Sequence, residues 1–168
     1  MATEAWDGSL PDALRKRFGD SLERVVHYGG QKLVVADLSA VPDILAFLKN
    51  EASFDYLVDI TAVHWPQREQ PLDIVWILYS FQRNERVRVK VACAEGSKVP
   101  SATLLYSGAN WLEREVYDMF GIEFENHPDL KRILMPDEWE GFPLRKDYGI
   151  YQQDGDWVRE NLKIESAQ

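Results

Sequence analysis

The sequence predicts an α+β fold: a mostly antiparallel sheet packed with helices, followed by a long extended C-terminal tail. Three observations lead to this prediction. Several segments are rich in Val, Ile, Tyr and Trp, the residues that favour strands. Other segments space their apolar residues three and four apart, as helices do. Residues 121–168 show neither pattern.

The N-terminal part predicts a helix and a strand pair. Residues 11–18 (PDALRKRF) carry Pro in an early turn, and Gly19 follows directly, so a short helix should end there. Residues 22–28 (LERVVHY) and 31–37 (QKLVVAD) are strand-like and flank a Gly-Gly pair. A two-residue glycine connection predicts a hairpin.

A second helix is expected after Ser39, whose hydroxyl is a suitable N-cap. The helix should end near Glu51. Its apolar residues have helical spacing, at Val41, Ile44, Leu45 and Leu48.

Three further strands are expected at residues 56–65, 72–81 and 86–94. The connection between the second and third strands is short enough for a hairpin. The third strand alternates valines with basic residues. One side of this strand should therefore be buried, and its basic side should face water or a partner.

A third helix is expected from Pro100 through Phe120, with Gly121 as its C-terminal stop. Its apolar side, which should pack on the sheet, consists of Leu112, Val116, Met119 and Phe120.

Residues 121–168 contain scattered Pro and Gly residues but also many apolar and aromatic side chains. Such a segment has too little regular structure for a core of its own and too much apolar surface for a solvated tail. We therefore expect residues 1–120 to form an α+β scaffold domain. Residues 121–168, with Tyr151 and Trp157 among them, should form an extended tail that binds a partner surface.

Composition excludes several functions. The net charge of −9 makes a nucleic-acid partner unfavourable. The longest apolar run, Ile74 to Tyr79, is far shorter than the roughly 20 residues of a membrane-spanning helix. The single cysteine, Cys93, can form no internal disulfide and cannot supply the four thiolates of an iron–sulfur cluster.

The stretch from Trp111 to Leu134 (WLEREVYDMFGIEFENHPDLKRIL) is dense in acids, bases and a histidine, as an active site would be. Helical geometry argues against a carboxylate pair, because Glu113 and Glu115 point about 200° apart. Glu115 and Asp118 share a face, and Arg114 is within reach of Asp118. This pattern is more typical of salt bridges than of an acid–base pair.

Metal and cofactor sites find little support. The histidines, His27, His64 and His127, lie in separate segments without metal-ligand spacing. His127 precedes a proline and is better suited to hydrogen-bond a neighbouring segment. No glycine-rich nucleotide loop is present, and Cys93 is expected to be a small core residue.

Residues 109–124 and 127–148 resemble the signature of the complex I 30-kDa-type family. Its members are the C subunit of the bacterial proton-pumping NADH:quinone oxidoreductase and the J subunit of the cyanobacterial and plastid complex. The family's Glu-Arg-Glu-x-x-Asp pattern, its downstream His, basic and aliphatic positions, and its Trp-Glu-Gly-x-Pro-Leu-Arg-Lys-Asp-Tyr block are all met. After Tyr148 many relatives continue with Pro, whereas this chain has Gly149.

The resemblance implies a non-catalytic subunit of the peripheral arm that binds no cofactor itself. FMN and the Fe–S clusters would belong to other subunits. The expected partners are the large quinone-site subunit and an Fe–S-bearing neighbour. The expected location is the cytoplasmic face of the inner membrane (or the stromal face of the thylakoid membrane), with membrane contact only through the complex.

We expect the charges and aromatics of the signature to direct the tail or form the subunit interface, with no catalytic, cofactor-binding or metal-binding role. Trp139, Arg145 and Tyr148 are side-chain types that dominate binding at interfaces, as is Tyr151. The full set is Glu113, Arg114, Glu115, Asp118, His127, Lys131, Arg132, Trp139, Arg145, Lys146, Asp147 and Tyr148.

Two alternatives remain open from sequence. The same family occurs in membrane-bound hydrogenases and ferredoxin-dependent complexes, and this chain contains nothing that identifies the electron donor. A different class, an independent soluble enzyme with Glu115, Asp118 and His127 as an acid–base site, would need a substrate pocket that the sequence does not indicate.

Overall fold

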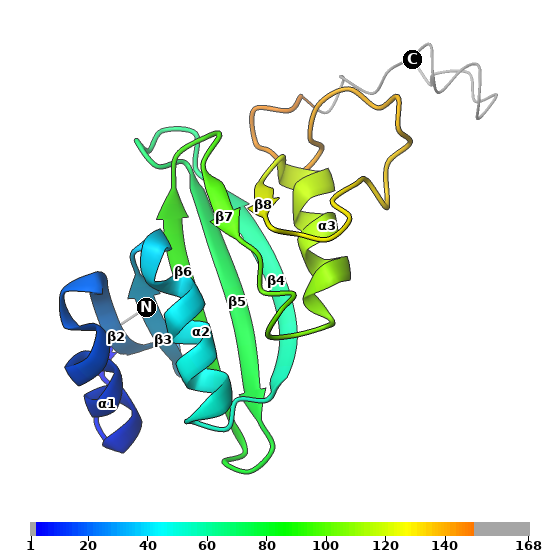
Figure 1. The fold of residues 1–168 in the computed structure, drawn as a ribbon. Helices are drawn as coiled ribbons and strands as arrows, with labels where there is room; N and C mark the ends of the chain where they lie inside the picture. The colour runs from blue at the N-terminus through cyan, green and yellow to red at the C-terminus, as the bar shows by residue number, and fades with distance from the viewer. Residues whose placement is uncertain (1–2, 150–168) are drawn as a thin grey trace.

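The computed structural model describes residues 3–149, and Tyr151 and Trp157 lie outside this range. Its centre is a six-stranded sheet with strand order β1-β2-β3-β6-β5-β4 (Figure 1). Within the described residues β3 and β6 run parallel and every other neighbouring pair in this sheet is antiparallel. The strands are β1 Thr3–Ala5, β2 Leu22–Tyr28, β3 Gln31–Ala36, β4 Tyr56–His64, β5 Leu72–Ser80 and β6 Glu85–Cys93. The predicted α+β class and mostly antiparallel sheet are confirmed.

Alternation explains which face of the sheet is buried. In β6, Val87, Val89 and Val91 are fully buried, whereas the basic residues between them are half-buried or exposed. The same side of β5 carries Trp76 and Leu78, which are also fully buried. Because neighbouring strands are in register, these side chains form one continuous apolar layer.

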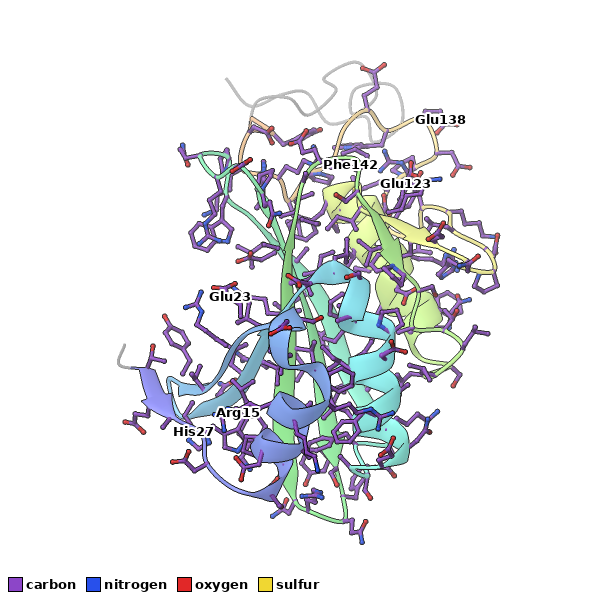
Figure 2. The ribbon with its side chains drawn as sticks, turned by 60° about the vertical axis from the view of Figure 1, so that its left-hand side comes forward. Arg15, Glu23, His27, Glu123, Glu138 and Phe142 are labelled. Carbon is purple, nitrogen blue, oxygen red and sulfur yellow. The ribbon has the colours of Figure 1, made fainter. Side chains whose placement is uncertain are left out.

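Three helices supply the other half of the core: α1 Ser9–Phe18, α2 Val41–Asn50 and α3 Ala109–Phe120. In Figure 1, α2 lies across the sheet and α3 lies beside β4. Arg15 of α1 donates to the carbonyl oxygens of Trp6 and Val25, at 3.0 Å each, which ties α1 to β2 (Figure 2). One apolar cluster joins residues of all three helices to the sheet.

Two predicted helix starts were wrong. Ser39 does not cap α2; it lies in a 3-10 turn, and Pro42 in the first helical turn fixes the backbone for helix entry instead. α3 begins at Ala109 rather than at residue 100. Residues Lys98–Pro100 form strand β7, which pairs in parallel with β8 (Glu123–Glu125), and turns connect β7 to α3.

The chain beyond α3 packs back onto the domain before it becomes irregular. Ile122 and Phe124 are buried in the same core as the helices. Gly121 ends α3 with φ 72°, and the ring of Phe142 occupies the space that a Cβ at Gly121 would fill. Glycine is therefore required at this position for its backbone conformation and for its lack of a side chain.

Candidate functional site

Asp118 on α3 is the centre of the charged cluster. Its carboxylate is fully buried and accepts the backbone N–H groups of Ile133, Leu134 and Met135 at 2.7–3.0 Å. The guanidinium of Arg132 donates to the other oxygen at 2.6 Å. Burial alone would raise the pKa of Asp118, but these hydrogen bonds outweigh it and lower the pKa. Asp118 therefore holds residues 132–135 against α3 as an ionised group.

Arg132 extends this network into the next loop. Besides Asp118, its guanidinium donates to the carbonyl oxygens of Trp139 at 3.0 Å and Gly141 at 3.1 Å. It also lies 5.4 Å from the ring centroid of Phe142, a cation–π distance. One side chain thus joins α3 to residues 139–142.

Arg114 acts on the same segment by a different route. The sequence placed it within reach of Asp118, but the ion pair of Asp118 in the described structure is with Arg132. Arg114 instead donates to the carbonyl oxygens of Lys131 and Arg132, at 3.2 and 3.4 Å, and stacks 5.0 Å from the ring of Trp111. The physical reason is that three backbone N–H groups and Arg132 already fill the acceptor sites of Asp118.

Glu113 and Glu115 point to different environments, as helical geometry predicts. Glu113 is fully buried and accepts from the hydroxyl of Ser101 at 2.7 Å and the N–H of Ala102 at 2.6 Å. Burial raises its pKa to about 7, against the lowering effect of these two bonds. Such a pKa suits a general acid or base, but the side chain has no contact with solvent. Glu115 is exposed, and the described residues give it no hydrogen bond or ion pair, so a role at a subunit interface stays a prediction.

His127 connects two segments by hydrogen bonds. Its Nδ1 accepts the N–H of Asp129 at 3.0 Å, so the proton of the neutral ring is on Nε2, which donates to the carbonyl oxygen of Asn110 at 3.1 Å. The expectation that His127 hydrogen-bonds a neighbouring segment is confirmed. Lys131, nearby, forms an exposed ion pair with Asp129 at 2.8 Å.

The last described residues are held by a second group of contacts at the end of β4. Arg145 donates to the carbonyl oxygen of Phe120 at 2.6 Å and lies 3.4 Å from Glu95. The backbone N–H of Lys146 donates to Nδ1 of His64 at 3.1 Å. The ammonium of Lys146 stacks 4.8 Å from the ring of Trp65.

Sequence reasoning did not assign His64 to this site. The signal was present, because His64 follows the buried positions Ile60 and Ala62 at every second residue of β4. Its side chain is 1% exposed, with Asp147 at 3.5 Å and Glu95 at 4.0 Å. These three ligand atoms lie within 4.8 Å of one another, which is close enough for a metal. However, both carboxylates are more than half exposed, and the Nδ1 of His64 already accepts a hydrogen bond.

The aromatic residues of the block lie at its surface. Trp139 and Tyr148 are half-buried, and the ring of Tyr148 packs against Gly141, which has φ 82°. Trp111, Leu134 and Leu144 are 63%, 59% and 55% exposed. Glu113, Arg114 and Asp118 are therefore buried within the chain, whereas Glu115 and several large apolar side chains are exposed.

In the described residues, carboxylates, guanidinium groups and an imidazole of the cluster form hydrogen bonds to backbone groups of the same chain. Among residues 3–149 no helix is both long and apolar enough to cross a membrane.

Comparison with known proteins shows the family of the chain. Residues 34–154 match the family model of the respiratory-chain NADH dehydrogenase 30 kDa subunit, and the chain belongs to that family. It is 42% identical over 152 residues to the NADH-quinone oxidoreductase C subunit of Brucella ovis, covering 89% of this chain and 75% of the relative. It is 45% identical over 133 residues to the C subunit of Paramagnetospirillum magneticum, covering 78% and 67%. The resemblance seen in the sequence is confirmed.

Two solved structures share the fold. A trypsin-resistant fragment of Nqo5 is 31% identical, with a TM-score of 0.64, and the match covers 72% of this chain and 98% of the fragment. A chain of the membrane-bound sulfane sulfur reductase, an archaeal respiratory membrane complex, is 25% identical, with a TM-score of 0.73, covering 92% and 89%. The protein is thus a subunit of the NADH:quinone oxidoreductase type, and its partners are other subunits of that complex.

Proposed function

We propose that this chain is a non-catalytic subunit of the peripheral arm of a proton-pumping NADH:quinone oxidoreductase, and that it positions neighbouring subunits. The observation that supports this most directly is the use of the signature charges. Within residues 131–141, Arg114 and Arg132 donate to backbone carbonyl oxygens, and Asp118 accepts backbone N–H groups. These three side chains therefore fix the shape of the segment, and none of them is available to react with a substrate.

The segment held in this way is the proposed docking surface. Trp111, Leu134 and Leu144 are exposed on α3 and on the segment that it holds. Large apolar side chains on a rigid, hydrogen-bonded support are typical of interface anchors. We assign the interface roles of Glu115, Trp139 and Tyr148 to the same surface.

The cofactors of the reaction would belong to partner subunits. Cys93, the one cysteine of the chain, is buried in β6, and its burial, reinforced by Asp73, raises the pKa of the thiol to about 11. Such a thiol is protonated at neutral pH and is a poor metal ligand. The proposal therefore assigns FMN, the Fe–S clusters and the quinone site to partner subunits of the complex.

A second candidate keeps the family and changes the complex. The sulfane sulfur reductase chain covers 92% of this chain, so the same scaffold occurs in another respiratory assembly. An equivalent role in a membrane-bound hydrogenase or a ferredoxin:quinone oxidoreductase is therefore the alternative. An independent acid–base enzyme is less consistent with the geometry, because Asp118 is buried and fully hydrogen-bonded.

The test is purification of the complex through an affinity tag on this chain in mild detergent. The proposal predicts that the large quinone-site subunit, an Fe–S-bearing subunit and a flavin-bearing NADH-oxidising subunit are recovered together. Vesicles of known orientation should show the tag on the cytoplasmic side. Recovery of a nickel-containing or ferredoxin-binding partner would favour the alternative complex. Recovery of a lone monomer would contradict the proposal.

A further inference from the structure

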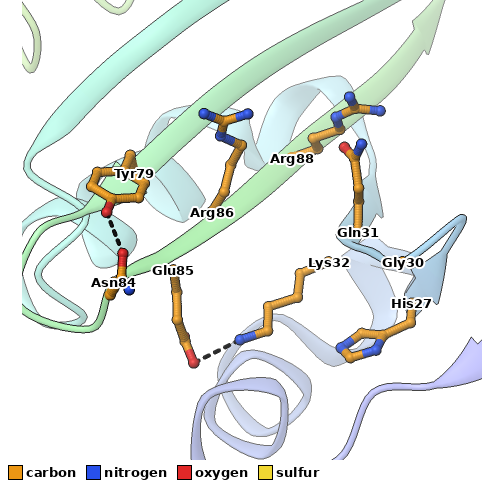
Figure 3. A pocket seen from close by; sticks show the side chains of 9 residues that line it. All are labelled: His27, Gly30, Gln31, Lys32, Tyr79, Asn84, Glu85, Arg86 and Arg88. Atoms are coloured by element: carbon orange, nitrogen blue, oxygen red, sulfur yellow. Dashed lines mark hydrogen bonds and ion pairs between the residues drawn. The ribbon is translucent and has the colours of Figure 1, made fainter.

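A pocket of about 420 Å³ lies between the β2–β3 turn and the β5–β6 hairpin (Figure 3). The hairpin is at the end of the sheet away from the C-terminal segment (Figure 1). The pocket is therefore separate from the docking surface described above. Its walls come from the start of β3, the start of β6 and the ends of β2 and β5.

Two arginines of β6 define the charge of this pocket. Arg86 and Arg88 are two residues apart on a strand, so they project from the same face, as Figure 3 shows. This face is opposite to the one that buries Val87 and Val89. It is the basic face that the alternation in the sequence predicts. The helices of residues 3–149 pack on the other side.

The two arginines have no carboxylate partner among the described residues, in contrast to their neighbours. Lys32 pairs with Glu85 at 2.7 Å, and Lys90 pairs with Asp73 at 3.1 Å. On the face of the arginines, Asp73 is thus already paired with Lys90, whereas Glu85 and Lys32 project from the opposite face with Val87. Although the chain carries a net charge of −9, this wall is locally positive and uncompensated.

One buried donor on this face also lacks an acceptor. The Nε of Arg88 is inaccessible to solvent and has no hydrogen-bond partner in the described structure. His27, whose Nε2 also lacks a partner, projects with Lys32 from the opposite face of the sheet and is not part of this positive wall. Buried polar groups in native proteins are nearly always satisfied, so groups left open at a pocket indicate an absent acceptor.

We propose that an acidic segment of another subunit inserts a carboxylate between Arg86 and Arg88. This inference rests on the proposed function. Arginine presents a planar fork that matches a carboxylate in a bidentate geometry, and Arg86 and Arg88 present two such guanidinium groups on one face. A protein segment is the best-suited occupant, because no helix among residues 3–149 covers the sheet face that carries the arginines, and a neighbour in the complex can lie against this face.

Arginine-specific modification with phenylglyoxal, followed by mass spectrometry, tests this proposal on the wild-type full-length chain and on the complex purified through it. The expected result is that Arg86 and Arg88 react in the isolated chain and lose at least about tenfold in reactivity in the complex, as a buried charge contact would require. Arg17 on α1, which pairs with Glu51 on the helix side, is the internal control and should keep its reactivity.

A second experiment reverses the charge of the two arginines. An Arg86→Glu, Arg88→Glu double variant should enter the complex at least about tenfold less than wild type, whereas Arg17→Glu should enter normally. A melting temperature on the isolated variants separates loss of folding from loss of binding. If the double variant does not fold, the modification of the wild-type protein decides.

Three results would overturn the inference. Equal reactivity of the two arginines in chain and complex means that no partner covers them. If Arg86 and Arg88 are equally unreactive in the isolated chain and in the complex, the chain itself covers them. Protection of the isolated chain by added citrate or phosphate, with the arginines still reactive in the complex, identifies a small-anion site instead. A wild-type chain that enters no complex refutes the proposed function, and this inference with it.

Discussion

Replacing Asp118 by Asn should destabilise the isolated chain by about 3 kcal/mol. One oxygen of Asn can continue to accept the N–H groups of residues 133–135, but its amide nitrogen then faces Arg132. Breaking a buried ion pair by removing one partner costs about 3–5 kcal/mol. The lower end applies, because Arg132 keeps the carbonyl oxygens of Trp139 and Gly141 and is 15% exposed.

Urea denaturation at pH 7 measures this difference, and Asp129→Asn is the matched control. Asp129 belongs to the same segment, but its ion pair with Lys131 is about 60% exposed on both sides, so that variant should unfold like wild type. The lowered pKa of Asp118 adds a pH signature. Its contribution is present above about pH 4, the ordinary pKa of Asp, and disappears as the pH falls through the lowered value. If Asp118→Asn and Asp129→Asn unfolded alike at pH 7, the network would not have the role assigned to it.

Three further predictions follow from single contacts. Because the pKa of Glu113 is raised to about 7, wild type should lose about 3 kcal/mol of stability between about pH 4.5 and pH 8, whereas Glu113→Gln should lose little, as urea titrations at several pH values would show. Gly121→Ala should lower the melting temperature more than Gly96→Ala, since both have φ 72° but Phe142 occupies only the space beside Gly121. A Leu134→Ser, Leu144→Ser double variant should unfold like wild type yet recover fewer partner subunits on purification.

The long elements were predictable from the sequence because their patterns are long. β4, β5 and β6 have nine residues each, enough for alternation to appear. β7 and β8 have three residues each and pair across α3, so no local pattern reveals them. The predicted start of α3 was wrong for the same reason, because residues 98–100 form strand β7 and pair with β8.

The structural role of the charged cluster was predictable from the sequence, but the hydrogen-bond partners of its residues were not. Helical geometry correctly separated Glu113 from Glu115, and the proline after His127 correctly indicated a hydrogen-bonding role. The partners of Asp118 are mostly backbone N–H groups, which every sequence contains, so the spacing of charges pointed to Arg114 instead. His64 was missed because its contact with Lys146 joins positions far apart in the chain.

The most direct test of the central claim compares assembly with turnover in the complex that carries Asp118→Asn. Membranes are assayed for the amount of assembled complex and for NADH:quinone turnover per assembled complex. If the cluster holds structure together, the amount falls while turnover per complex stays at the wild-type value. A complex that assembles in normal amount but has lost its turnover would contradict the claim and make Asp118 a participant in the reaction.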